Sequence, residues 1–401
     1  MSFQPTNFVV LACLSLVVFW PAMAAEPPDA AQIAANRAYA DQLFANGKYD
    51  EAANEYEIVR RLFVHVLGEA HVQTIAVHEK LAETYSISYR HDDELPVRRA
   101  LLDLKRRHLG REHQETLAAM NNLAKILVYE EEMIEGEALF TKLLAIRRRI
   151  SGPEAPITLQ TWQDLAETLA GEEKNKAAAA EFRQLLAVRR RVLGPEHRDT
   201  VDTQFWLAAS LADLKRYAEA EKEFTDNLAI RERIEDLHDP NDPDNHPKAT
   251  ALMYLAGVLF NEGRYEEQET RLRELIALRK LLASKSREDK GMSLFRSYDL
   301  CHLSEALLLQ KKYAEAEAEY RGVLLYYDEK QNGKRHGCDR EVFEVCNKLA
   351  RSLKEQGKLQ EALEYTHRVE SSADIKVNVY KALYKEAVKL RQEIEAASAK
   401  Q

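Results

Sequence analysis

The sequence predicts an all-α repeat protein built from about eight antiparallel helix pairs and a C-terminal capping helix. Three observations predict it. Residue types recur every 42 positions, and apolar residues recur three and four positions apart. The helix-breaking residues are scarce, with 14 Gly and 11 Pro in a chain of 401 residues.

The 42-residue period is clearest in the first half of the chain. It is kept by one Gly, one Thr and one Ala per unit: Gly68, Gly110, Gly152 and Gly194; Thr74, Thr116, Thr158 and Thr200; Ala40, Ala82, Ala124, Ala166 and Ala208. After Ala208 the spacing widens to 46–48 residues, and the extra residues fall between helices, where insertions cost little. A sustained period of this length predicts supersecondary units that stack on their neighbours.

Each unit has the pattern of two helices. The first carries bulky-x-x-Leu-Ala-x-x-Leu, as at 162–169, so its apolar positions share one face. A turn follows in which Gly47 or Gly263 supplies a left-handed residue. The second helix carries a small residue and an aromatic residue four positions later, as in Ala178 and Phe182. It closes at Leu-Gly, after which a Thr or Asp is expected to cap the next helix.

The second unit departs from this pattern. Residues 91–96 read His-Asp-Asp-Glu-Leu-Pro where a clean turn and a small residue are expected. Because proline inside a helix removes a backbone hydrogen bond, we expect the second helix of this unit to start late.

Three segments carry a resemblance to a known family: Asn121-Asn122-Leu123-Ala124, Leu144-Ala145-Ile146-Arg147 and the stretch 193–200. They resemble the tetratricopeptide repeat, in the 42-residue variety of the kinesin light chains. The resemblance covers about residues 30–370. It implies a right-handed superhelical solenoid whose concave groove is lined by the first helix of each pair. It also implies a non-enzymatic scaffold that binds a peptide or protein, with no cofactor.

In the family's register, the groove positions are the second, fifth, ninth and twelfth residues of each first helix. They include Asn121, Lys125, Val128, Gln163, Glu167, Phe205, Ala209, Met253, Phe260, Cys301, Asn347 and Arg351. The part around Phe205, Met253 and Phe260 is apolar, and an apolar patch in a groove predicts a binding site. The alternative is that Phe205 and Met253 pack between repeats.

The family also has a row of Asn side chains along the groove that contact the peptide backbone. Asn121, Asn122 and Asn347 stand at matching positions. This chain departs from the row at the other equivalents, which are Arg37, Glu79, Gln163, Phe205, Met253 and Cys301.

Basic and histidine residues recur with the repeat. His71, His113 and His197 occur once per unit, about 10 Å apart by helix packing distances, which is too far for one metal ion. We interpret them as structural. The runs 105–107 and 147–149, and the equivalent run 189–191, end second helices. We interpret them as solvated faces that complement the helix ends; a basic stripe for an acidic partner is the alternative.

Two further segments suggest chemistry at first sight. The stretch 236–246 is acidic and broken by Pro, but it lacks the ligand order and Gly of an EF-hand, so we interpret it as an insertion rather than a calcium site. Cys301 and His302 are adjacent on a helix and point about 100° apart, which does not make a nucleophile and its base. The sequence predicts no catalytic residue and no metal site.

Composition and cysteines narrow the partner class. A net charge of −9 and a pI near 5.8 argue against nucleic acid, which needs a basic footprint. Outside the N-terminal segment there are three cysteines, and Cys338 is a candidate to pair with Cys346 or Cys301. The identity of the partner and the oligomeric state stay open.

The N-terminal segment 1–25 has the pattern of a secretory signal peptide. An apolar run from Phe8 to Trp20 precedes small residues, so cleavage is expected after Ala24 or Ala25, with the mature chain periplasmic or extracellular. The alternatives are a lipoprotein acylated at Cys13 and an uncleaved anchor. After signal removal no transmembrane segment is expected. The predicted domains are the solenoid at 26–370 and the capping helix and tail at 371–401.

Overall fold

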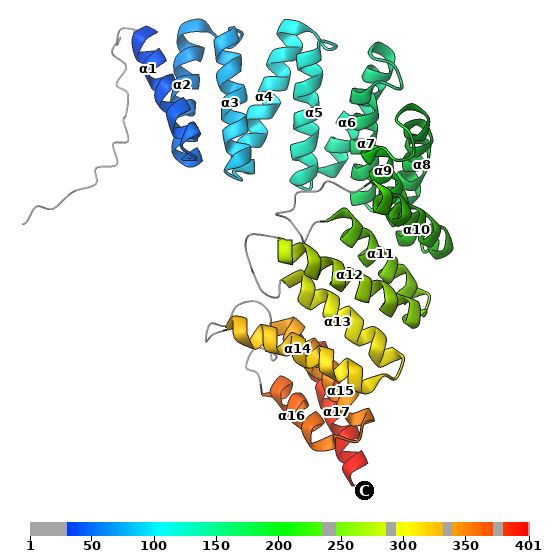
Figure 1. Ribbon diagram of the computed structural model, residues 1–401. Coiled ribbons are helices and arrows are strands. Elements are labelled where there is room, and N and C mark those ends of the chain that lie inside the picture. Colours follow the sequence, from blue (N-terminus) through cyan, green and yellow to red (C-terminus); the bar gives the residue numbers. More distant parts are fainter. Residues whose placement is uncertain (1–29, 235–245, 286–293, 332–338, 372–379, 400–401) are drawn as a thin grey trace, which may run out of the picture. The chain divides into compact units, whose positions relative to one another are not determined.

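The computed structural model describes residues 30–234, 246–285, 294–331, 339–371 and 380–399. These ranges contain seventeen α-helices and no strand. Figure 1 labels the helices along the chain. The prediction of an all-α chain of helix pairs is confirmed. The predicted signal peptide, Cys338 and most of the acidic insertion lie outside the described residues.

The chain divides into two compact units, Met1–Ile126 and Leu127–Gln401, with the boundary inside α5. The first unit contains α1 (Ala30–Ala45), α2 (Tyr49–Leu67), α3 (Val72–Ile87), α4 (His91–Leu109) and most of α5 (Gln114–Tyr129). The second unit contains α6 (Met133–Ile150), α7 (Pro156–Gly171), α8 (Asn175–Val192), α9 (Arg198–Asp213), α10 (Tyr217–Arg233), α11 (Pro247–Asn261), α12 (Tyr265–Lys285), α13 (Leu294–Leu309), α14 (Tyr313–Gln331), α15 (Asp339–Glu355), α16 (Leu359–Glu370) and α17 (Lys381–Ser398).

In chain order, α1 to α16 make eight pairs, and α17 follows them. From α1 to α4, and again from α6 to α17, each helix packs against the next helix along the chain, and α17 also packs on α15. The register alanines are buried at the helix crossings: Ala40, Ala82, Ala124, Ala166 and Ala208. The aromatic residue of the second helix is buried as well, as at Phe182 and Phe224. The small residue permits close approach, and the aromatic ring fills the space between helices.

The turn between the two helices of every pair contains one left-handed residue. Their φ angles lie between 56° and 77°: Gly47, Tyr89, Glu131, Glu173, Lys215, Gly263, Lys311 and Gly357. Only three of the eight are Gly, so the repeat imposes the left-handed turn even where the side chain opposes it.

The second helix of the second pair does not start late. α4 begins at His91, directly after the left-handed Tyr89, and Pro96 lies inside it. Glu94, which is 1% exposed, binds Nδ1 of His91 at 3.0 Å and Nε of Arg98. These contacts hold the first turn in the repeat's register, and the proline is accommodated within it.

The expected Thr or Asp caps are also wrong, because histidine takes that place. The Nδ1 atoms of His71, His113, His197 and His246 accept a hydrogen bond from the backbone N–H two residues later, at 3.2–3.3 Å. The ring nitrogen thereby performs the task of a capping oxygen. In the fourth pair Ala155 stands at this position and makes no side-chain cap. Thr74 instead lies inside α3 and donates to the carbonyl of Gly68 at 2.8 Å.

In the described part of the chain, no helix combines the length and apolar character needed to cross a membrane.

Candidate partner-binding site

A basic side chain is buried in the last turns of five second helices. The five residues are Lys105, Arg147, Arg189, Arg231 and Arg279. The first four are 42 residues apart and the last is 48 further on. The first residue of each predicted Arg run is therefore buried, while the second residues Arg148 and Arg190 are exposed.

Arg189 shows what the buried position does. Its Nη1 donates to Oε1 of Gln163 in α7 at 3.0 Å, and to the carbonyl of Asp199 and Oγ1 of Thr203 in α9 at 2.9 and 2.6 Å. The guanidinium at the end of α8 thus joins the first helix of its own pair to the first helix of the next pair.

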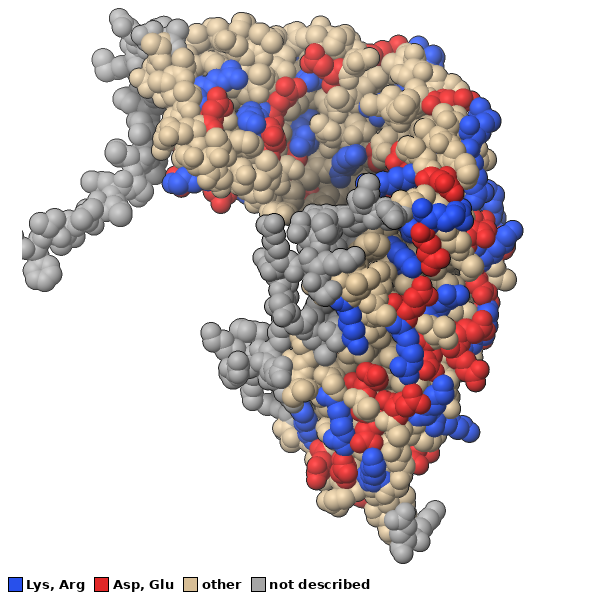
Figure 2. All heavy atoms as spheres, in the orientation of Figure 1, with Lys and Arg blue, Asp and Glu red and all other residues tan. Residues whose placement is uncertain are grey.

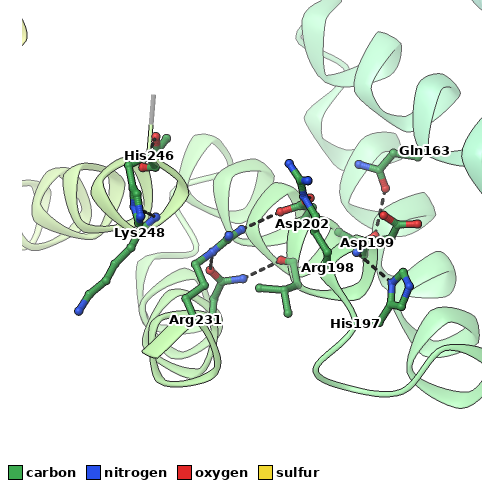
Figure 3. A network of polar contacts seen from close by, with 12 residues as sticks. Gln163, His197, Arg198, Asp199, Asp202, Arg231, His246 and Lys248 are labelled. Carbon is green, nitrogen blue, oxygen red and sulfur yellow. Dashed lines mark hydrogen bonds and ion pairs between the residues drawn. The ribbon is translucent and has the colours of Figure 1, made fainter. Parts of the chain in front are cut away.

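The other buried basic residues bind different acceptors at the equivalent place in their repeats. Arg231 donates to Oδ1 of Asp202 at 2.8 Å, which Figure 3 shows beside the capping contact of His197. In the first unit Lys105 binds Glu79 and lies 3.2 Å from Glu115. Burial works to lower the pKa of Lys105, but its hydrogen bonds to these two carboxylates outweigh burial and raise it.

The buried cations explain two of the departures from the family's row of asparagines. Glu79 and Gln163 stand at positions of that row, and each binds the cation 26 residues later. Asn347, which keeps the family residue, donates to the carbonyl of Leu383 in α17 at 3.1 Å. At these three positions the side chain makes a contact within the solenoid.

The outer residues of the Arg runs face acidic neighbours. Arg190 lies 3.7 Å from Glu223, and Arg191 lies 2.6 Å from Glu154. On the face that Figure 2 draws, basic and acidic side chains alternate over α8 to α12 rather than gathering by sign. This arrangement supports the interpretation of the runs as solvated faces.

A cleft of about 350 Å³ opens in the second unit among α9 to α13. Its walls are formed by Met253, Tyr254 and Phe260 of α11 and by Tyr298 and His302 of α13. Tyr254, Phe260 and Tyr298 are all exposed, Tyr298 by 53%. Two of the three apolar residues predicted for the groove, Met253 and Phe260, therefore line one cleft.

Phe205 has the other predicted role. It is 8% exposed, and its ring packs edge-on against Tyr254 and Phe224, with centroids 5.2 and 5.7 Å apart. It packs between repeats and does not line the cleft, so the packing alternative applies to Phe205. Its contact with Tyr254 fixes one wall of the cleft from behind.

Polar groups stand among the aromatic walls. Asp213 at the end of α9 and Glu305 in α13 line the cleft, together with His302. Glu305 lies 2.9 Å from Nζ of Lys348. Burial raises the pKa of Asp213 above its ordinary value and lowers that of His302. Burial, followed by the nearby Asp213 charge, also raises the pKa of Tyr254.

The remaining predicted residues lie apart from this cleft. Gln163 is buried and binds Glu167 at 2.8 Å, whereas Arg351 is exposed and binds Glu386 of α17 at 2.8 Å. In the first unit Asn121 is half-buried and Lys125 is exposed.

Sequence reasoning missed the other lining residues, among them Asp213, Tyr254, Tyr298 and His302. Two signals were present in the sequence. Tyr254 follows the predicted Met253, and Tyr298 and His302 are four apart, which places them on one helix face.

Cys301 carries a free thiol, so the structure does not pair it with another cysteine. Burial raises the pKa of Cys301 to about 12, which keeps the thiol protonated and unreactive at neutral pH. Cys346 is buried, and its pairing with Cys338 stays a prediction because Cys338 lies outside the described residues. Among the described residues, no group of three or more His, Cys, Asp or Glu is placed to hold a metal ion.

Comparisons with known proteins identify the repeat type of part of the chain. Residues 115–191, which reach from α5 into α8, match the model of the tetratricopeptide repeat. No curated protein sequence matches the chain.

Several solved structures are similar to the chain. A signal transduction ATPase from Pyrococcus horikoshii with a tetratricopeptide repeat sensor is 13% identical with a TM-score of 0.53, over 86% of this chain and 50% of that one. The kinesin light chain repeats of Podosopora anserina are 21% identical with a TM-score of 0.46, over 53% and 99%. The quorum sensor NprR from B. thuringiensis is 14% identical with a TM-score of 0.49, over 92% and 94%.

At these identities the first of the structures supports the fold alone. The match at residues 115–191 confirms the repeat type that the sequence predicted. The chain therefore contains tetratricopeptide repeats, and its helix pairs have the tetratricopeptide-repeat fold.

Proposed function

We propose that the chain is a non-enzymatic scaffold that holds a peptide or protein partner in the cleft among α9 to α13. The observation that carries this proposal is the exposure of Tyr254, Phe260 and Tyr298 around one preformed cleft. Ligand sites are typically concave and largely apolar, with a few polar groups that fix orientation. The cleft has this composition, and a buried aromatic cluster fixes its wall at Tyr254.

The test removes the apolar wall without touching the core. Met253→Ser and Phe260→Ser together should abolish recovery of co-purifying proteins, because both side chains line the cleft and neither is fully buried. Ile134→Ser is the matched control, since Ile134 is 80% exposed on α6 and does not line the cleft. Unchanged recovery with the double variant would sink the proposal.

We further propose that the chain acts in the periplasm or outside the cell after cleavage near Ala25. The support is the pattern of residues 1–25 alone. Intact mass of the mature protein decides the matter: a first residue at Ala25 or Glu26 supports export as a free protein. An acylated Cys13 would instead favour an assembly factor attached to the envelope, and an unprocessed Met1 would favour an anchored adaptor.

A further inference from the structure

The charge and the rings of the cleft restrict the chemistry of its occupant. Resting on the proposed function, we infer that the cleft takes a cationic side chain of its partner, arginine or lysine, seated between the aromatic walls and Asp213.

Uncompensated negative charge is the first argument. The lining residues include two carboxylates and no Lys or Arg. Glu305 is compensated by Lys348, at 2.9 Å. Within the described ranges, Asp213 has no ion pair or side-chain hydrogen bond, and its neighbour Arg216 binds Glu219 instead. Asp213 therefore supplies the net charge of the site.

The environment of Asp213 increases the attraction that its carboxylate has for a cation. Asp213 is exposed where it lines the cleft, and partial desolvation there raises the pKa of its carboxyl. A cation brought to this place gains more than at a fully hydrated carboxylate, because the local dielectric is lower. Asp213 would repel an acidic side chain at the same place. The cleft therefore favours a cationic over an anionic side chain.

Aromatic side chains are the second argument. Tyr254 and Tyr298 present exposed rings from neighbouring first helices, and Phe260 adds a third. A guanidinium or ammonium group is attracted to the face of such rings, and guanidinium also stacks on them. His302 packs edge-on against Tyr298, with centroids 4.4 Å apart, and its pKa is lowered by burial. The neutral imidazole therefore adds no positive charge that would oppose the cation.

The test begins with random dodecapeptides displayed on phage and selected on the full chain. Selected peptides are synthesised in pairs, one with arginine and one with citrulline, which keeps the shape and loses the charge. Binding is measured by fluorescence anisotropy. We expect the arginine peptide to bind about tenfold more tightly, and this ratio to fall toward one in Asp213→Asn. Ile134→Ser should keep the wild-type ratio.

Each outcome separates the inference from the proposed function. Equal binding of the two peptides by the wild type would overturn the cationic occupant. The scaffold would still stand if Met253→Ser with Phe260→Ser abolished that binding. Peptides that bind this double variant as well as the wild type would overturn the proposed function itself. Failure to select any peptide would overturn both. Circular dichroism of Asp213→Asn checks that the helices are retained.

Discussion

Arg189 donates a hydrogen bond of 3.0 Å to Gln163, a residue 26 positions earlier, and both side chains are buried. The same guanidinium reaches Thr203 in the next helix pair at 2.6 Å. One cation therefore connects three helices, α7, α8 and α9. Because neighbouring repeats share only their common interface, such a contact bears directly on how cooperatively they unfold.

The first prediction concerns this cation. Arg189→Ala leaves Gln163 and Thr203 without their shared donor and opens a cavity, so we expect a loss of about 3 kcal/mol in the free energy of unfolding. Arg190→Ala, one residue along and exposed, should change it by less than about 0.5 kcal/mol. Urea unfolding followed by far-UV circular dichroism measures both. Equal losses in the two variants would contradict the role of the buried Arg189 in joining the three helices.

The second prediction concerns the histidine caps. His197→Ala removes the acceptor for the backbone N–H of Asp199, which lies 3.2 Å away, and should destabilise the chain by about 1 kcal/mol. Ala155→Ser supplies an acceptor where the fourth pair lacks one and should stabilise the chain by a similar amount. We expect the melting temperature to fall in His197→Ala and to rise in Ala155→Ser. An unchanged melting temperature in His197→Ala would show that the cap does not contribute to stability.

The third prediction concerns the left-handed turn residue. Glu173 has φ 59° and Gly263 has φ 73° at equivalent positions. Glu173→Gly should raise the melting temperature, because a side chain in this conformation costs about 1 kcal/mol or more. Gly263→Ala should lower it for the same reason.

A control separates strain from the general effect of glycine. Gly322 lies inside α14, and a Cβ there meets nothing within 4 Å. Gly322→Ala should therefore stabilise the helix by roughly 0.5–1 kcal/mol. If Gly263→Ala and Gly322→Ala shift the melting temperature in the same direction, the left-handed turn is not the cause.

The repeat itself could be predicted because it depends on local spacing. Ala166 is buried where a small residue recurs every 42 positions, and Gly47 has the left-handed conformation that its turn requires. Such features need no knowledge of the neighbouring repeat. The expected late start of α4 failed because the repeat register and the contacts of Glu94 outweighed the local effect of Pro96.

The cleft was predicted in part, because its lining depends on contacts between repeats. Met253 and Phe260 were found from their register, whereas Asp213 lies at a helix end, where the register assigns no groove position. Phe205 stands at the same register position as Met253 and is buried by neighbouring rings. The buried Arg189 was missed for a related reason: one residue of a run turns inward by about 100° relative to the next.

The last prediction concerns acid stability at the contact between the sixth and seventh pairs. Burial favours a raised pKa for Glu269, but hydrogen bonds from Lys312, Arg273 and Gln310 outweigh it and lower the pKa to about 2. A carboxylate whose pKa is lowered by folding stabilises the native state above its ordinary pKa. That contribution is fully present at neutral pH and is lost as the pH falls from about 4.5 to about 2.

Melting temperatures at pH 7 and pH 3 test this contribution. Glu269→Gln removes the charge, so the variant should melt lower than the wild type at pH 7 and lose less on transfer to pH 3. Glu266→Gln is the control, since Glu266 is exposed in the first turn of the same helix. The same arrangement recurs one pair later, where Glu317 accepts hydrogen bonds from Lys358 and Gln356. Glu317→Gln should therefore repeat the effect, and a pH-independent difference for both variants would exclude carboxylate titration as its cause.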